Sequence, residues 1–203
     1  MIMIVVDALP PRLRLTLLIS LLAILLLVQA LLLYHWRLEL AQTLIPYLQL
    51  LVELCEQRFD VAEFQVLHGG NEQLFSLRLT ADHPLPVHGR VLPGMDVSAT
   101  TLVTHLLLDL WIYGAVLIIG IALQPLRAVR LLPAAMAGLG LLLWLDIPLV
   151  LLGSIEGLLL QHLAPDRLDT DPWVLWQQFL TQGGRMVLAL GLGLLVLGVG
   201  RKR

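Results

Sequence analysis

Apolar residues are concentrated in four runs along the chain, longer than the strands or buried helices of a soluble domain. A helix needs about 20 apolar residues to cross about 30 Å of hydrocarbon. Three runs reach this length. The fourth, residues 186–199, reaches it only if its helix begins near Pro172, where Thr170-Asp171-Pro172 is typical of an N-cap followed by proline. The pattern predicts an all-α bundle of four transmembrane helices, at residues 13–34, 101–124, 131–153 and 183–200.

Residues 35–100, between the first two runs, have the patterns of a water-soluble module. In residues 36–58 apolar side chains recur every three or four positions with Glu and Gln between them, which predicts a helix that Pro46 kinks or interrupts. The segment has about 65 residues, too few to bury a large core. We therefore expect the module to depend on the transmembrane helices or on a partner for its stability.

The second half of this module alternates apolar and polar side chains. The alternation over residues 61–67 and 72–80 predicts two strands, and His68-Gly69-Gly70-Asn71 between them is typical of a hairpin turn. A third strand is predicted at residues 87–92, bounded by prolines that suit strand edges. The sequence thus predicts a small α+β module between the first and second transmembrane helices.

A second polar segment, residues 154–182, holds an acidic loop punctuated by prolines and then Trp173 and Trp176. Tryptophans at this spacing are typical of a short interfacial helix whose rings lie at the level of the lipid headgroups. The alternative is that the rings grip a lipid or polyprenyl substrate. We interpret the two tryptophans as membrane-interface anchors.

Basic residues indicate the orientation of the helices. Seven of the 13 Lys and Arg residues flank the apolar runs in three blocks, and transmembrane helices retain such residues on their cytoplasmic side. Both polar segments then lie outside. The parts predicted to be cytoplasmic are residues 1–12, 125–130 and 201–203.

An alternative for the first apolar run is a cleaved signal peptide, because Val28-Gln29-Ala30 resembles a cleavage site. The run continues past this site, which favours a membrane anchor. Leucine-rich spans, compact loops and a preference for Arg over Lys favour a bacterial inner membrane. The outer segments would then be periplasmic.

Composition excludes several functions. With 58% hydrophobic and 14% charged residues, the chain has the balance of a polytopic membrane protein. Its outer segments hold twelve of the 15 acidic residues, which argues against nucleic-acid binding.

The single cysteine, Cys55, excludes an intramolecular disulfide and is interpreted as a small apolar residue. The spacing of His68, His83 and His88 matches no standard metal site, so we predict no metal and no cofactor.

Polar side chains within the second span form a regular series. Ionisable groups in a membrane are costly and are candidates for function. The series recurs every fourth residue, which places its members on one face of a helix. Its members are Thr101, His105, Asp109 and Tyr113.

Asp146 in the third span and Arg185 in the fourth are predicted to meet this series. At about 1.5 Å per residue, Asp109 and Asp146 lie about 12 and 10 Å below the outer ends of their spans. Arg185 falls in the outer turns of the fourth span. Because unpaired charges in lipid are costly, we expect Arg185 to face both aspartates.

Three interpretations of this polar cluster remain open. The first is a structural network that fixes the packing of the spans. The second is an outer-leaflet enzyme, with His105 and Asp109 as an acid/base pair and Asp146 and Arg185 beside them, Arg185 orienting an anionic group. The third is a proton relay. No nucleophile, phosphate-loop, HExxH or GxSxG motif occurs in the sequence, which weighs against a conventional enzyme.

Small residues in the last two spans predict close helix contacts. In the fourth span glycine recurs every seven residues, and the third span offers further small side chains. Such faces serve packing within the chain or docking to another membrane protein, including a second copy. The residues are Gly184, Gly191, Gly198, Ala134 and Gly138.

The layout resembles that of small accessory membrane proteins of exosortase-type sorting loci. The shared features are an amino-terminal anchor, a short external α+β segment and three carboxy-terminal spans, with the polar series His105, Asp109 and Tyr113 opening the second span. The sorting enzymes themselves use a catalytic Cys with Arg and His in membrane helices, and Cys55, outside the spans, departs from that pattern. The resemblance implies an assembly or substrate-handling partner and not the transpeptidase.

We therefore hypothesise a non-enzymatic accessory or assembly subunit of a cell-envelope, export or protein-sorting system. Its expected contacts are membrane lipids and partner membrane proteins. The alternative is a small membrane enzyme acting on a lipid-linked substrate at the outer leaflet.

The predicted topology is testable with reporter fusions. Fusions after Gly70 and Asp169 are expected to be active when the reporter requires the periplasm, because both positions lie outside. A fusion at the carboxy terminus is expected to be active only with a cytoplasmic reporter. A periplasmic carboxy terminus would show that the basic blocks were read wrongly.

Overall fold

The computed structural model describes residues 11–56, 58–69, 72–81, 85–87, 90–92, 96–123 and 128–199. The chain forms two compact units, Met1–Trp36 and Arg37–Arg203. In the first unit the helix α2, Pro11–His35, is apolar all round, and its described side chains are mostly exposed. A helix without a buried or polar face suits a lipid environment.

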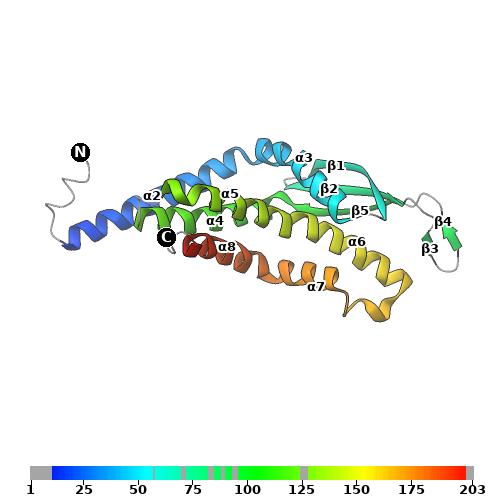
Figure 1. Cartoon of the computed structure of the whole chain (residues 1–203). Helices are drawn as coiled ribbons and strands as arrows, with labels where there is room; N and C mark the ends of the chain where they lie inside the picture. The colour runs from blue at the N-terminus through cyan, green and yellow to red at the C-terminus, as the bar shows by residue number, and fades with distance from the viewer. Residues whose placement is uncertain are drawn as a thin grey trace. The chain divides into compact units, whose positions relative to one another are not determined.

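The second unit is mostly helical, with a small sheet (Figure 1). Its helices α4, α5 and α8 contact one another, and α3, α6 and α7 lie towards the sheet. The short segments η2, Pro165–Arg167, and η3, Leu180–Gly184, join the later helices. The helices are α3 (Arg37–Cys55), α4 (Val103–Leu123), α5 (Ala128–Leu145), α6 (Ile147–Leu163), α7 (Pro172–Phe179) and α8 (Arg185–Val199).

Five helical segments among the described residues are long and apolar enough to cross a membrane. This confirms the expectation of a helical membrane protein at the level of length and composition. Four of the segments overlap the predicted spans, and the additional one is α3, which was expected to be external. The five are Thr16–His35, Arg37–Cys55, Val103–Leu123, Leu131–Leu163 and Pro172–Val199.

Two predicted helix boundaries have different outcomes. The N-cap before Pro172 is confirmed, because the Asp171 side chain accepts hydrogen bonds from the backbone N–H groups of Trp173 and Val174. The helix predicted to end at residue 153 instead continues to Leu163, after a break at Asp146. At 33 residues, about 50 Å, this helical run exceeds the hydrocarbon thickness.

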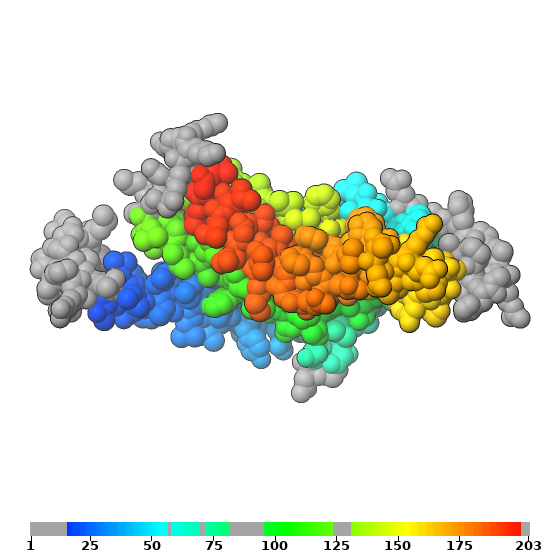
Figure 2. All heavy atoms as spheres, turned by 90° about the horizontal axis from the view of Figure 1, so that it is seen from below, coloured from blue at the N-terminus to red at the C-terminus, as the bar shows by residue number. Residues whose placement is uncertain are grey.

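The three helices α4, α5 and α8 pack through small residues. A Cβ at Gly138 would lie 2.5 Å from Tyr113 Oη and 2.8 Å from Val196 Cγ2, so only glycine fits there. Gly193 packs in the same way against Val116. Figure 2 shows the red segment of α8 beside the green atoms of α4, the helix that it contacts. The buried residues at the centre of this bundle are Tyr113, Leu131, Leu142, Ala189 and Val196.

The predicted packing residues divide into two groups. Gly138 is in a tight contact, Ala134 packs against the bundle core, and Gly184 lies against the ring of Phe179. Gly191 and Gly198 make no such contact among the described residues, since a Cβ at either would meet nothing within 4 Å. Their alternative use, docking to another membrane protein, stays a prediction, while Gly193 makes the helix contact.

The sheet has the order β1-β2-β5, with antiparallel pairs. The predicted hairpin is confirmed as β1, Phe59–Gly69, paired with β2, Glu72–Ala81; its turn residues Gly70 and Asn71 lie outside the described residues. The predicted third strand at residues 87–92 is wrong, because that region forms a separate pair of β3, Leu85–Val87, and β4, Arg90–Leu92. The third strand is β5, Asp96–Leu102, which leads directly into α4.

One face of this sheet is apolar and is covered by helices. Phe64 and Phe75 stack on it with ring centroids 6.1 Å apart, and Leu77, Leu79 and Ala99 are buried beside them. The helix α3 contacts β1, and α6 contacts β5. This arrangement agrees with the expectation that the module depends on the helices, because α6 follows the sheet in the sequence by more than 40 residues and lies beyond the predicted module.

Several predictions concern residues outside those the structure describes. They include the basic blocks around residues 124–127 and 201–203 and the side chains of His83 and His88. The side chains of Arg12 and Arg14 belong to the same group. The cytoplasmic assignment of the three basic blocks stays a prediction.

Two alanine substitutions test the glycine packing with one added carbon each. Alanine stabilises a helix by up to about 1 kcal/mol relative to glycine, so Gly191→Ala, in open space, is expected to leave Tm unchanged or raise it. Gly138→Ala is expected to lower Tm by several degrees, because overpacking costs about 1–3 kcal/mol. Thermal unfolding of the detergent-solubilised variants is the measurement. Equal Tm values would contradict the packing described for Gly138.

Candidate functional site

The candidate site is a buried polar cluster where three parts of the second unit meet. Arg185, the first residue of α8, places Nε 3.0 Å from Oδ1 of Asp146, in the break between α5 and α6. Its Nη2 donates a hydrogen bond of 3.4 Å to the hydroxyl of Thr101, near the end of β5. Asp146 and Arg185 expose only 1% and 5% of their surface. The predicted pairing of Arg185 with Asp146 is present.

The break at Asp146 follows from the proline two residues later. Pro148 has no N–H to donate to the carbonyl oxygen four residues earlier, and its ring crowds that turn of the helix. Asp146 has φ −94° and ψ −87°, away from helical values, and α6 begins at the next residue. The carboxylate therefore lies at a helix end, where side chains from other elements can reach it.

A second break brings Arg185 to the same place. Gly183 has φ +105°, a conformation that glycine adopts without strain and other residues rarely do. Gly183 lies inside the wide turn η3, which ends at Gly184, and α8 starts at the next residue, Arg185. Irregular backbone at membrane depth is tolerated only where protein or water covers it. The two breaks face each other, and the ion pair links them.

Asp109 lies beside the ion pair but is less well satisfied. It is 1% exposed, and neither carboxylate oxygen receives a hydrogen bond from a donor in the described part of the chain. The carboxyl groups of Asp109 and Asp146 are close enough to interact. Because an ionised carboxylate only accepts hydrogen bonds, the two can bond directly only when one of them carries a proton. Nδ1 of His105, on the same helix, is also buried without a partner among the described residues.

The predicted polar series is only partly a helix face. Thr101 is in strand β5 and not on the helix, yet its hydroxyl reaches Arg185. His105 and Asp109 lie on α4 near the cluster. Tyr113 is directed elsewhere: its hydroxyl donates to the carbonyl oxygen of Ala135 at 2.7 Å and joins α4 to α5. Tyr113 is therefore a packing residue of the bundle.

The estimated depths also need correction. Asp109 is six residues, about 9 Å, from the start of α4 at Val103. Asp146 lies within the apolar helical segment Leu131–Leu163, at the break directly after the end of α5 at Leu145. The cluster lies where the helices of the bundle end and the sheet begins.

Trp176 contributes to this site in a way that its sequence position did not indicate. Its indole Nε1 donates a 2.8 Å hydrogen bond to the carbonyl oxygen of Leu145, at the helix break. The ring also packs against Phe179, with centroids 5.4 Å apart. Its N–H is thus used within the protein. The Trp173 ring is 36% exposed, and its role as an interfacial anchor stays a prediction.

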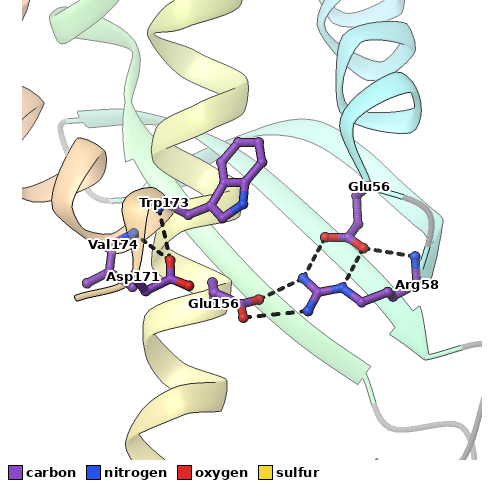
Figure 3. A network of polar contacts seen from close by, with 6 residues as sticks. All are labelled: Glu56, Arg58, Glu156, Asp171, Trp173 and Val174. Carbon is purple, nitrogen blue, oxygen red and sulfur yellow. Dashed lines mark hydrogen bonds and ion pairs between the residues drawn. The ribbon is translucent and has the colours of Figure 1, made fainter. Parts of the chain in front are cut away.

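A second polar network lies at the end of α3, beside the sheet (Figure 3). Arg58 forms ion pairs with Glu56 at 2.9 Å and with Glu156 of α6 at 2.7 Å. The hydrogen bonds that Arg58 donates to Glu56, and to a smaller extent those to Glu156, raise the pKa of Arg58 above its ordinary value. A hollow of about 400 Å³ beside them is also lined by Cys55, Asp171 and Trp173. This network clamps α3 to α6.

The sequence interpretation missed this clamp. One signal was present, because Glu156 is the only acid within the apolar α6 and so needed a partner. Its partner could not be identified, since Arg58 is 98 residues away. Cys55 beside it accepts a hydrogen bond of 3.3 Å from the indole of Trp144. A small, weakly polar side chain is consistent with the interpretation of Cys55 as a packing residue.

Within the described residues there is no group of three or more His, Cys, Asp or Glu side chains that could hold a metal ion. Comparisons of the chain with protein-family models, with curated proteins and with solved structures found no match.

The hydrogen bond of Trp176 can be tested with a conservative substitution. Trp176→Phe keeps an aromatic ring but removes the donor to Leu145, and an unsatisfied carbonyl in a buried site costs about 1–3 kcal/mol. We expect a lower Tm than for the wild type in detergent. Trp173→Phe, at a more exposed ring, is the matched control and is expected to have a smaller effect. If both substitutions lower Tm equally, the indole bond does not stabilise the break.

Proposed function

We propose that this protein is a non-enzymatic accessory or assembly subunit in a bacterial inner membrane. In this proposal it is a multi-pass protein with both termini in the cytoplasm and the sheet in the periplasm. It serves a cell-envelope, export or protein-sorting system by presenting the sheet to a partner membrane protein. The observation that carries the proposal is the enclosure of the polar cluster at the junction of bundle and sheet.

Enclosure argues for a structural role. A general acid or base must come within hydrogen-bonding reach of its substrate. Asp109, Asp146 and Arg185 are buried, and Arg185 is held by Asp146 and Thr101. In this conformation they contact one another and not a surface that a lipid-linked substrate could reach.

The position of the cluster supports the same role. Thr101 belongs to the last strand of the sheet, Asp146 joins the bundle helix α5 to α6, and Arg185 opens α8. An ion pair among these three parts holds the sheet in one orientation on the bundle. Removing one partner of such a buried pair typically costs about 3–5 kcal/mol, because the other charge is left unpaired.

The proposed membrane arrangement uses four spans, in α2, α4, α5 and α8. The helix α3 carries Arg37, Glu39 and Glu53, which suits the membrane surface better than its interior. Its Tyr47 hydroxyl donates to the carbonyl oxygen of Gly140 in α5 at 3.2 Å, so its middle lies beside the bundle. The polar ends of α3 then remain in water.

The layout supports an accessory role, because it resembles that of the small accessory membrane proteins of exosortase-type loci. The shared layout is an anchor, an external α+β segment and three further spans. In that setting the partner would be a membrane protein that handles sorted substrates. Cys55 ends α3, outside the proposed spans, and accepts a hydrogen bond from the indole of Trp144.

A second candidate function is favoured by one observation. Both oxygens of Asp109 and Nδ1 of His105 are buried without hydrogen-bond partners among the described residues. A lipid-modifying enzyme or a proton relay would use such groups when the site opens. This candidate predicts that His105 is essential, whereas the structural role does not.

Substitutions in the cluster separate the two candidates. Arg185→Ala is expected to reduce the amount of folded protein in the membrane severalfold, because it leaves a buried carboxylate unpaired. Adding Asp109→Asn and Asp146→Asn is expected to restore much of it. The measurement is the monodisperse fraction after detergent extraction, with His105→Ala as a variant expected to be close to wild type.

The contrary outcome is equally definite. If the triple variant and His105→Ala are both abundant but fail to complement a deletion strain, the structural proposal is wrong. The enzyme or relay is then the better account.

A further inference from the structure

A groove of about 540 Å³ lies between β5, α6 and α7, away from the polar cluster. Ser98, Ala99 and Thr100 of β5 line one side of it. Small residues of α6, among them Gly153 and Gly157, line another side. None of the described residues that line the groove carries a charge.

The groove exposes the edge of a β-strand and not one of its faces. Side chains along a strand alternate between the two faces of a sheet. Ser98 and Thr100 are exposed on one face, and Ala99 is buried on the other, yet all three consecutive residues line the groove. Their shared backbone must therefore border it. The opposite edge of β5 is paired with β2.

An open strand edge needs hydrogen-bond partners. In the order β1-β2-β5, no strand from the described part of the chain pairs with the groove side of β5. Such an edge does not occur in contact with lipid, because unsatisfied backbone groups in hydrocarbon cost several kcal/mol each. The edge is therefore bordered by water or by another polypeptide, and an open edge is a template for an added strand.

We propose that this groove binds an extended, uncharged segment of a partner protein as an added strand along β5. The unpaired edge of β5 offers backbone hydrogen bonds to an added strand, and the absence of charge in the described lining favours an uncharged occupant. A second copy pairing through its own β5 fits less well, because its α6 and α7 would meet those of the first copy. The inference names the partner contact of the proposed function and rests on it.

A peptide library provides the probe. Full-length protein in nanodiscs is used to select from phage-displayed peptides of about 12 residues, with empty nanodiscs for counter-selection. We expect uncharged peptides rich in β-branched residues, the composition that favours strands. Bound peptide is expected to slow hydrogen exchange of the amides at residues 98–100.

Two glycine variants make the test specific. A Cβ at Gly157 would lie 3.7 Å from Val174 Cγ2, so Gly157→Leu is expected to fill the groove without a backbone clash. Peptide affinity should fall at least tenfold. Gly191→Leu adds the same side chain in open space on α8 and should leave the affinity unchanged. Thr100→Lys, which adds a charge beside the edge, is a second blocking variant should Gly157→Leu fold poorly.

Three results would overturn the inference. The first is that no peptide is enriched, and the second is that binding survives both blocking variants. The third is that, without any peptide, the β5 amides already exchange slowly and the protein has the mass of a dimer. That result would identify a second copy as the occupant. Peptide binding is measured on purified wild-type protein, independently of the cluster variants. The groove inference can therefore fail while the cluster variants support the structural role, and the structural role can fail while peptide still binds.

Discussion

The ion pair between Arg185 and Asp146 is the interaction on which the second unit depends. A charge taken from water into a helical bundle is tolerated only with a partner, and here the partners come from two helix ends and one strand end. The pair requires both helix breaks to lie at the same level. It also requires the last strand of the sheet to enter the bundle beside them. Three connections that are remote in sequence are thereby held at one point.

The helix breaks divide the later part of the chain into segments that pack in the bundle and segments that cover the sheet. Without the break at Asp146, the helix from Leu131 to Leu163 would be one rod of 33 residues. With it, α5 packs in the bundle against α8, while α6 covers the apolar face of the sheet and packs against α7. The hydrogen bond from Trp176 to Leu145 and the clamp of Arg58 on Glu156 stabilise this second layer. The sheet is therefore supported by helices on either side of the break.

This arrangement explains why a small sheet can be presented stably at a membrane. A module of this size has too little core to be robust alone, and α6 supplies the missing apolar surface from beyond the predicted module. The same helices leave one strand edge bordering a groove. A sheet with an open edge is suited to holding another polypeptide, as the proposed accessory role requires.

The sequence alone determined the helical membrane character, the hairpin, the N-cap at Asp171 and the residues of the ion pair. These follow from local patterns: lengths of apolar runs, alternation, capping chemistry and the cost of charge in lipid. Sequence spacing also indicated Thr101 correctly, but for the wrong reason, since it was assigned to a helix face and lies on a strand.

Only the tertiary structure decided the remaining features. Strand β5 was hidden because its pairing with β2 depends on a partner strand and not on its own composition. Gly193, and not Gly191, makes the helix contact because the rotation of α8 is set by Val116 and its other neighbours. Glu156 pairs with Arg58, which lies 98 residues away in the sequence. In each case the outcome depends on which distant surfaces meet, and a pattern along the chain carries no record of that geometry.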